Sequence, residues 1–222
     1  MSAQYNKQVK LETIFENGGR FSSGANGTAS SVAFNTTGAT LHTGTDTTGR
    51  AFIRSQNGYN GYSVFDRNPE ILFVAFLQAD SPVHTDSWDA YLTTGTGLIC
   101  GGNTVIDTVD FSFFGFHIKC VSGVGSVYAS TNIATNAVTE TLLDISGLGL
   151  GTTPFENNVT YYAKLTSGQK IDYYINGVLL DTETTNLPTG NSGDPFDVGI
   201  LKNAGSDDQV VQVLQARFAF DQ

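Results

Sequence analysis

The chain has 222 residues, of which 40% are hydrophobic and only 14% charged, and its formal net charge is -10. This length and apolar content suffice to bury the core of one globular domain. The acidic balance and the scattered Lys and Arg residues predict no nucleic-acid partner and no partner membrane. The longest apolar run, Ile71 to Leu77, is too short to cross a bilayer and is typical of a buried strand.

The first residues, MSAQYNKQVKLETIFENGG, contain no apolar stretch of the kind that a signal peptide requires. We therefore expect synthesis and folding in a cytoplasm. Cys100 and Cys120 could pair, but in a reducing compartment free thiols are expected. The polar segment 1–8 is predicted to be an N-terminal docking arm, and residues 9–222 a single domain.

Strand-like stretches follow one another along the chain, separated by Gly, Asn, Asp or Thr, and no segment sustains the period of a helix. In chain order we expect strands at residues 10–16, 30–34, 39–43, 50–55, 71–78, 89–93, 110–118, 124–130, 140–145, 159–166, 170–176, 178–184, 198–202 and 210–220. About fourteen strands with hardly a helix predict an all-β, two-sheet antiparallel sandwich. The last strand ends in apolar residues, and we expect it inside a sheet, near the N-terminal strand.

The segment DYYINGVLLDTETTNLP, residues 172–188, has the pattern of a hairpin. Asn176-Gly177 lies between alternating apolar residues, and a type I′ turn needs positive φ at both of its central positions. A two-residue turn with regular pairing would place Asp172 opposite Asp181. The predicted core face collects Ile171, Tyr173, Ile175, Val178 and Leu180.

This hairpin carries a family resemblance together with its neighbours. The segments FENNVTYYAKLTSGQKIDYYINGVLLDTETTNLP and FDVGILKNAGSDDQVVQVLQARFAF resemble concanavalin A-like, laminin-G-like jelly rolls. Residues 38–55 and 110–119 resemble strands of the versions found in bacteriophage and other virion decoration, fibre or tail proteins. The resemblance implies a jelly roll of two packed antiparallel sheets, one of them concave and often a glycan-binding surface.

From this resemblance we expect a non-enzymatic protein of the virion surface, made in the host cytoplasm. It would serve as a capsid decoration, fibre or tail-associated module that attaches to other virion proteins, binds host-surface glycans and forms a homo-oligomer. Two alternatives stay open, because the same fold hosts several activities. They are a free-standing lectin or carbohydrate-binding module, and a polysaccharide-cleaving glycosidase or lyase.

The sequence predicts no catalytic residue. Glycoside hydrolysis needs two carboxyl groups that flank the scissile bond. Asp172 and Asp181 are the only pair that the expected register brings together, and the Glu-x-Asp-x-x-Glu motif of related glucanases is absent. The three histidines, His42, His84 and His117, are isolated and are interpreted as structural or surface residues.

Carbohydrate binding requires aromatic faces beside amide and carboxylate groups. Two places in the sequence combine them. One surrounds the only tryptophan, and the other is the loop SQNGYNGYS. The predicted glycan-binding residues are Asp86, Trp88, Asp89, Tyr91, Tyr59 and Tyr62. A role in the core or in an interface is the alternative for each of the aromatic residues.

Calcium is the one cofactor that the sequence leaves open. Asp80, Asp207 and Asp208 lie in acidic loop segments, which provide the oxygen ligands that a hard cation prefers. Solvated acidic loops are the alternative interpretation. No other cofactor is expected.

Overall fold

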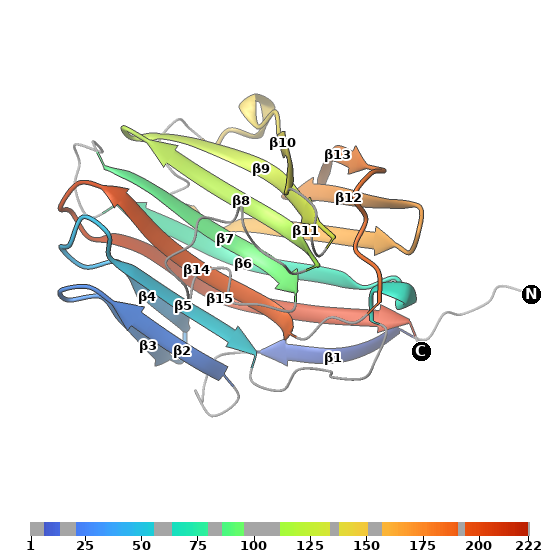
Figure 1. The fold of residues 1–222 in the computed structure, drawn as a ribbon, viewed down its shortest axis with the longest axis horizontal. Coiled ribbons are helices and arrows are strands. Elements are labelled where there is room, and N and C mark those ends of the chain that lie inside the picture. Colours follow the sequence, from blue (N-terminus) through green and yellow to red (C-terminus); the bar gives the residue numbers. More distant parts are fainter. Residues whose placement is uncertain are drawn as a thin grey trace, which may run out of the picture.

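The computed structural model describes residues 7–13, 21–55, 64–79, 86–95, 112–133, 138–150, 157–190 and 194–221. These residues form two antiparallel β-sheets that pack face to face (Figure 1). Within these ranges the helical segments are two single turns, η2 (Phe65–Arg67) and η4 (Ser146–Leu148). The all-β sandwich predicted from the sequence is therefore confirmed.

One sheet has eight strands, and seven of them follow the order β13-β12-β11-β6-β15-β4-β3. The eighth strand, β1, pairs with the second half of β15, whereas β4 pairs with its first half. The strands of this sheet are β1 (Lys7–Thr13), β3 (Ser31–Asn35), β4 (Gly38–His42), β6 (Glu70–Ala79), β11 (Val159–Thr166), β12 (Lys170–Ile175), β13 (Val178–Glu183) and β15 (Gln209–Asp221).

The other sheet has seven strands in the order β10-β9-β8-β7-β14-β5-β2. Its strands are β2 (Phe21–Asn26), β5 (Arg50–Ser55), β7 (Ser87–Gly95), β8 (Phe113–Val121), β9 (Val124–Asn132), β10 (Thr139–Leu142) and β14 (Asp194–Ala204). Because three of the six neighbour pairs, β7-β14, β14-β5 and β5-β2, join strands that are not consecutive in the sequence, side chains from distant parts of the chain meet on each face.

The core lies between the sheets and follows the alternation of the strands. In β11 every second residue, from Val159 to Leu165, is buried, and the residues between them are partly exposed. Aromatic rings from both sheets interlock there. Phe116 of the seven-stranded sheet packs edge-on against Tyr161 and Tyr173 of the other, with ring centroids 5.3 and 5.5 Å apart. Such edge-to-face contacts add to the stability that burial supplies.

Most predicted strands have a counterpart in the structure, and the expected place of the last strand is confirmed. β15 lies inside its sheet and pairs with β1, β4 and β6. Strand β2 was not predicted, because its sequence, FSSGAN, is rich in residues that disfavour strands. β1 begins at Lys7, within the segment predicted to be an arm, and residues 1–6 lie outside the described residues.

The β12–β13 hairpin has a different register from the one expected. Asn176 and Gly177 both have positive φ, as a type I′ turn requires. A bulge after the first two pairs shifts the rest, so that Asp172 lies opposite Thr182 and Asp181 lies opposite Tyr173. The predicted opposition of Asp172 and Asp181 is therefore wrong. The bulge relieves the repulsion that two directly opposed carboxylates would have.

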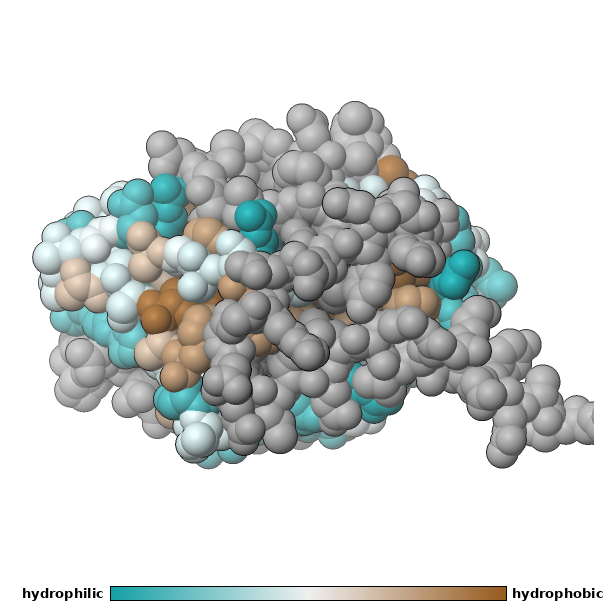
Figure 2. Space-filling model, turned by 90° about the horizontal axis from the view of Figure 1, so that it is seen from below, coloured by the Kyte–Doolittle hydropathy of each residue, from teal (hydrophilic) through white to brown (hydrophobic). Residues whose placement is uncertain are grey.

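Figure 2 views the molecule from the edge at which β1, β2 and β3 lie in Figure 1. The described surface there has an apolar area bordered by polar residues. Val32 and Phe34 of β3 are partly buried against the core.

Among the described residues no helix has the length and apolar character to cross a membrane. Cys120 is a buried free thiol, and Cys100 lies outside the described residues.

Candidate functional site

The outer face of the seven-stranded sheet carries a cluster of polar and aromatic side chains. Strand β7 directs Trp88, Ala90 and Leu92 into the core, so the residues between them point outward. Strand β8 does the same with Phe114, Phe116, Ile118 and Cys120. The register then brings the outward residues of adjacent strands side by side, with Tyr91 opposite His117 and His117 opposite Tyr128.

His117 lies between two carboxylates. Its Nδ1 is 2.5 Å from Glu140 Oε1, and its Nε2 is 3.0 Å from Asp89 Oδ1. The imidazole side chain is only 4% exposed, whereas the two carboxylate side chains are 17% and 19% exposed. An imidazole that donates from both nitrogens satisfies both contacts. His117 therefore fixes the positions of two carboxylates that come from different strands, β7 and β10.

The second oxygen of each carboxylate is also engaged. Asn203 of β14 donates from Nδ2 to Asp89 Oδ2 at 2.5 Å, and Lys119 donates from Nζ to Glu140 Oε2 at 2.7 Å. Lys119 Nζ lies 4.8 Å from the centre of the Tyr128 ring, within the range of a cation–π contact. The cluster thus displays amide, ammonium, carboxylate and phenol groups along five neighbouring strands, β10-β9-β8-β7-β14.

The charges in the cluster stabilise one another. Burial alone would raise the pKa of Glu140, but the hydrogen bond and charge of His117, together with those of Lys119, lower it to about 2. Burial would lower the pKa of Lys119, but its hydrogen bond to Glu140 and the nearby negative charges raise it. Both groups are therefore ionised at neutral pH.

Aromatic packing supports the cluster from one side. The Tyr91 ring stacks on His117, with centroids 4.2 Å apart and planes inclined by 27°. Tyr91 and Phe113 are buried on this outer face and pack with Phe52 and Val138, which makes a second apolar cluster separate from the main core. The half of the face near Tyr91 is therefore closed. The half toward the β8–β9 turn is open, since Asn203 and Leu142 are exposed there.

The predicted glycan-binding residues have different positions in the structure. Asp89 is part of the cluster on the outer face, and Tyr91 supports it. Trp88 is 1% exposed and packs in the main core, so its ring offers no face to a sugar. Tyr59 and Tyr62 lie outside the described residues. Asp86 is buried in a different network, described below.

The glycan-binding residues predicted from the sequence do not include His117, which was interpreted as a structural or surface residue, or Lys119, Glu140 and Asn203. A signal for the first two was present, because the alternation in FFGFHIKCV places His117 and Lys119 on the face opposite Phe114, Phe116 and Ile118. Glu140 and Asn203 had no such signal. They come next to His117 and Asp89 only through the strand order β10-β9-β8-β7-β14, which local patterns do not reveal.

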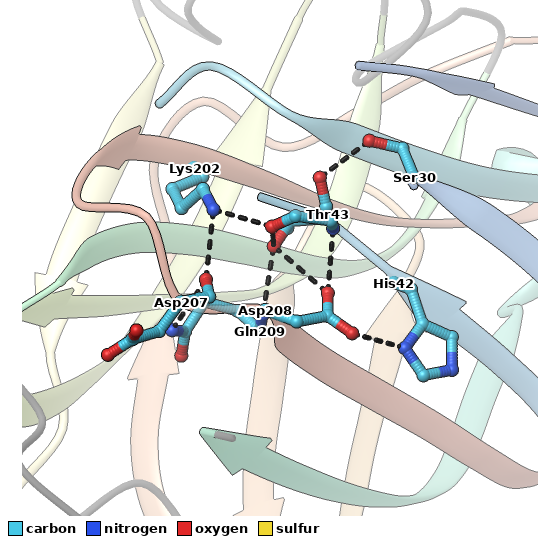
Figure 3. A network of polar contacts seen from close by, with 8 residues as sticks. Ser30, His42, Thr43, Lys202, Asp207, Asp208 and Gln209 are labelled. Atoms are coloured by element: carbon cyan, nitrogen blue, oxygen red, sulfur yellow. Dashed lines mark hydrogen bonds and ion pairs between the residues drawn. The ribbon is translucent and has the colours of Figure 1, made fainter. Parts of the chain in front are cut away.

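A second polar network joins the two sheets at the β14–β15 turn (Figure 3). The buried Lys202 of β14 donates from Nζ to the carbonyl oxygens of Gly44, at 2.6 Å, and Asp207, at 2.9 Å. Asp208 accepts from the Gly44 backbone N–H at 2.7 Å, and its other oxygen is 2.6 Å from His42 Nδ1. The network therefore links the end of β4 to β14 and β15 and has a structural character.

Asp86, which directly precedes β7, also belongs to this network. One of its oxygens accepts hydrogen bonds from the backbone N–H of Asp207, at 2.9 Å, and from Gln209 Nε2, at 3.2 Å. Burial lowers the pKa of Lys202, although the nearby carboxylates of Asp86, Asp208 and Asp207 counteract the effect. The ammonium group is thus held by carbonyl groups at hydrogen-bond distance and by carboxylates farther away.

The predicted calcium ligands fall in and near this network. Asp208 is paired with His42. The Asp207 carboxylate points away from the other groups of the network (Figure 3). Within the described part of the chain, no group of three His, Cys, Asp or Glu side chains is arranged to hold a metal ion. Asp80 lies outside the described residues, so the calcium site stays a prediction.

The cluster on the outer face is suited to hydrogen bonding with a polar ligand. A glycosidase of the usual kind needs one carboxyl group that is protonated near neutral pH, which requires a raised pKa. Glu140 has the opposite property. Asp172, the other carboxylate considered from the sequence, lies on the other sheet, bonded to Lys170 and Thr182 at 2.8 and 2.7 Å.

No family model and no curated protein matches the sequence. Solved structures do resemble the fold. The carbohydrate recognition domain of Emp47p aligns with a TM-score of 0.59 and 10% identity over 99% of this chain and 96% of that one. The β-glucanase of Bacillus licheniformis aligns with a TM-score of 0.59 and 14% identity over 94% and 96%.

A legume lectin-like domain from Entamoeba histolytica aligns with a TM-score of 0.54 and 12% identity over 90% of this chain and 89% of that one. Identities this low show the fold alone, and the fold hosts both sugar-binding proteins and glycosidases. The sheet order, the sandwich and these similarities together show that the chain folds as a concanavalin A-like jelly roll.

Proposed function

We propose that the protein binds glycans through the outer face of its seven-stranded sheet and does not cleave them. The observation that carries this proposal is the ordered set of Asp89, Asn203, Lys119 and Glu140, held in place by the buried His117. Fixed carboxylate, amide and ammonium groups can match sugar hydroxyls at little cost in side-chain entropy. The low pKa of Glu140 supports binding over acid catalysis.

The test is a glycan array probed with the wild-type protein and with two single variants. Asn203→Ala removes an exposed hydrogen-bonding group and its support of Asp89, and binding should fall about tenfold, which corresponds to ~1.4 kcal/mol. Asp172→Asn, on the outer face of the other sheet, is the matched control and should bind like the wild type. Absence of binding to every glycan would contradict the proposal.

Catalysis is tested separately with the polysaccharides that bind. We expect no release of reducing ends, because neither mechanism of glycoside hydrolysis proceeds without a proton donor for the leaving group. Release that Glu140→Gln abolishes would contradict the non-enzymatic proposal and would identify a glycosidase.

We further propose that the protein performs this binding on the surface of a virion, as a decoration, fibre or tail-associated module. The support is the resemblance of residues 38–55 and 110–119 to strands of such proteins. Mass spectrometry of particles purified from the source that encodes the chain tests it. Particles that lack the protein would overturn the virion proposal and leave glycan binding untouched.

A further inference from the structure

The large apolar side chains that are most exposed gather beside the proposed site. Among the described residues Val121, Leu142 and Val124 are 62%, 61% and 58% exposed, more than any other large apolar residue. All three share the outer face of the seven-stranded sheet, because Val121 pairs with Val124 and Leu142 pairs with Tyr128 across neighbouring strands. Isolated apolar residues are ordinary on protein surfaces, but a group on one face indicates a contact.

This apolar strip is continuous with the polar groups of the site. Tyr128 has Leu142 on one side and the Lys119 ammonium over its ring. Val121 lies two residues beyond Lys119 in β8, and Val124 lies in β9, the strand of Tyr128. The two valines therefore extend the strip toward the β8–β9 turn. A ligand that reaches Lys119 and Glu140 therefore meets apolar surface immediately next to them.

We infer that the site prefers acetamido sugars, which is an inference that rests on the proposed glycan binding. An acetamido group carries an N–H donor, a carbonyl acceptor and a methyl group within a few atoms. The site offers a partner for each part. The Glu140 carboxylate can accept from the N–H, the Lys119 ammonium can donate to the carbonyl oxygen, and the side chains of Leu142 and Tyr128 can contact the methyl group. A hydroxyl group at the same sugar position has no part that uses the strip.

Matched sugars test this preference. Calorimetric titration would compare the β-1,4-linked tetramers of N-acetylglucosamine and glucose, and N-acetylgalactosamine with galactose. We expect at least about fourfold tighter binding of the acetamido member, the gain from burying a single methyl group. Leu142→Ser should remove most of that preference. Leu179→Ser is the matched control, because Leu179 is 50% exposed on the other sheet, and the preference should persist.

The outcomes separate this inference from the function on which it rests. Equal affinity within both pairs, or a preference that Leu142→Ser leaves intact, would overturn the inference while glycan binding stands. If the protein binds none of the four probes, the inferred preference for acetamido sugars is also overturned. The proposed glycan binding is overturned only if no glycan on the array is bound. If Leu142→Ser changes self-association or retention on particles but not the sugar preference, the strip is a protein contact and the inference is wrong.

Discussion

His117 is the residue on which the candidate site depends. It contributes little surface of its own, yet both ring nitrogens contact carboxylates that would otherwise repel each other. Tyr91 fixes the plane of the ring, and the two carboxylates fix its rotation. A single buried side chain thus sets the geometry of two partly exposed carboxylates on different strands, β7 and β10, in the way that supporting residues orient the groups of preorganised sites.

The free energy of unfolding at acidic pH should depend on the contacts of Glu140 with His117 and Lys119. The pKa of Glu140 is about 2 in the folded protein, compared with an ordinary value of 4.5. Because the folded-state pKa is lowered, the contribution is complete above pH 4.5 and is lost as the pH falls toward 2. At ~1.36 kcal/mol per pKa unit it amounts to at most about 3 kcal/mol.

Urea unfolding of the wild type and of Glu140→Gln at several pH values measures this contribution. The wild type should be more stable at pH 6, and the difference should shrink progressively below pH 4.5. A difference between the two proteins that is the same at pH 6 and at pH 2.5 would show that Glu140 is not held as a carboxylate by His117 and Lys119.

At the scale of the strands, glycine makes one close approach possible. Gly115 lies in the middle of β8 with φ 155°, where a Cβ would be 2.3 Å from the backbone oxygen of Leu92 and 2.6 Å from Thr93 Cα. Since these atoms are backbone of the neighbouring strand, they cannot move aside without disturbing the pairing of β7 and β8. Glycine at this position lets both strands carry their parts of the site at the observed spacing.

Gly115→Ala should therefore lower the free energy of unfolding by about 3 kcal/mol, through strain and steric overlap. Gly168 in the β11–β12 turn also has positive φ, but a Cβ there would meet no atom within 4 Å. Gly168→Ala should cost only about 1 kcal/mol, the conformational term alone. Thermal or chemical unfolding compares the two, and equal losses would refute a close contact at Gly115.

The strands also show what local sequence patterns predict and what they do not. Alternation in β11 and β8 identifies the core faces, because period-two burial leaves a direct trace in the sequence. It does not locate β2, which pairs with β5 although its residues, FSSGAN, disfavour a strand. The bulge in β13 likewise has no pattern of its own, and it alone determines that Asp172 faces Thr182.

At the scale of the whole molecule, acidic residues that are close in the sequence belong either to the candidate site or to the network between the sheets. Asp86 and Asp89 are three residues apart, yet Asp86 is buried in the network around Lys202 whereas Asp89 belongs to the outer face. Their proximity in the sequence suggested one glycan-binding cluster with Trp88. The alternation along β7, which begins at Ser87, separates inward from outward positions, and only the arrangement of both sheets assigns each carboxylate its role.

The buried Lys202 should hold the two sheets together at this end of the sandwich. Lys202→Met keeps much of the side-chain volume but removes the ammonium hydrogen bonds to the carbonyl oxygens of Gly44 and Asp207. The Asp207 oxygen then keeps only the bond from Gln209 Nε2, at 3.2 Å. The expected loss in the free energy of unfolding is about 3 kcal/mol, since each hydrogen bond from a charged donor contributes roughly 1.5 to 3 kcal/mol. Hydrogen exchange of the backbone amides at the end of β4 should quicken as well.

Lys164→Met is the appropriate comparison, because Lys164 is a partly exposed residue of β11 whose substitution should change the free energy by no more than about 0.5 kcal/mol. Glycan binding should survive in both variants when it is measured well below their unfolding transitions, since neither lysine belongs to the outer face of the seven-stranded sheet. A Lys202→Met protein as stable as Lys164→Met would mean that packing alone joins the sheets there. A stable variant that no longer binds glycans would instead place the binding surface at the β14–β15 turn.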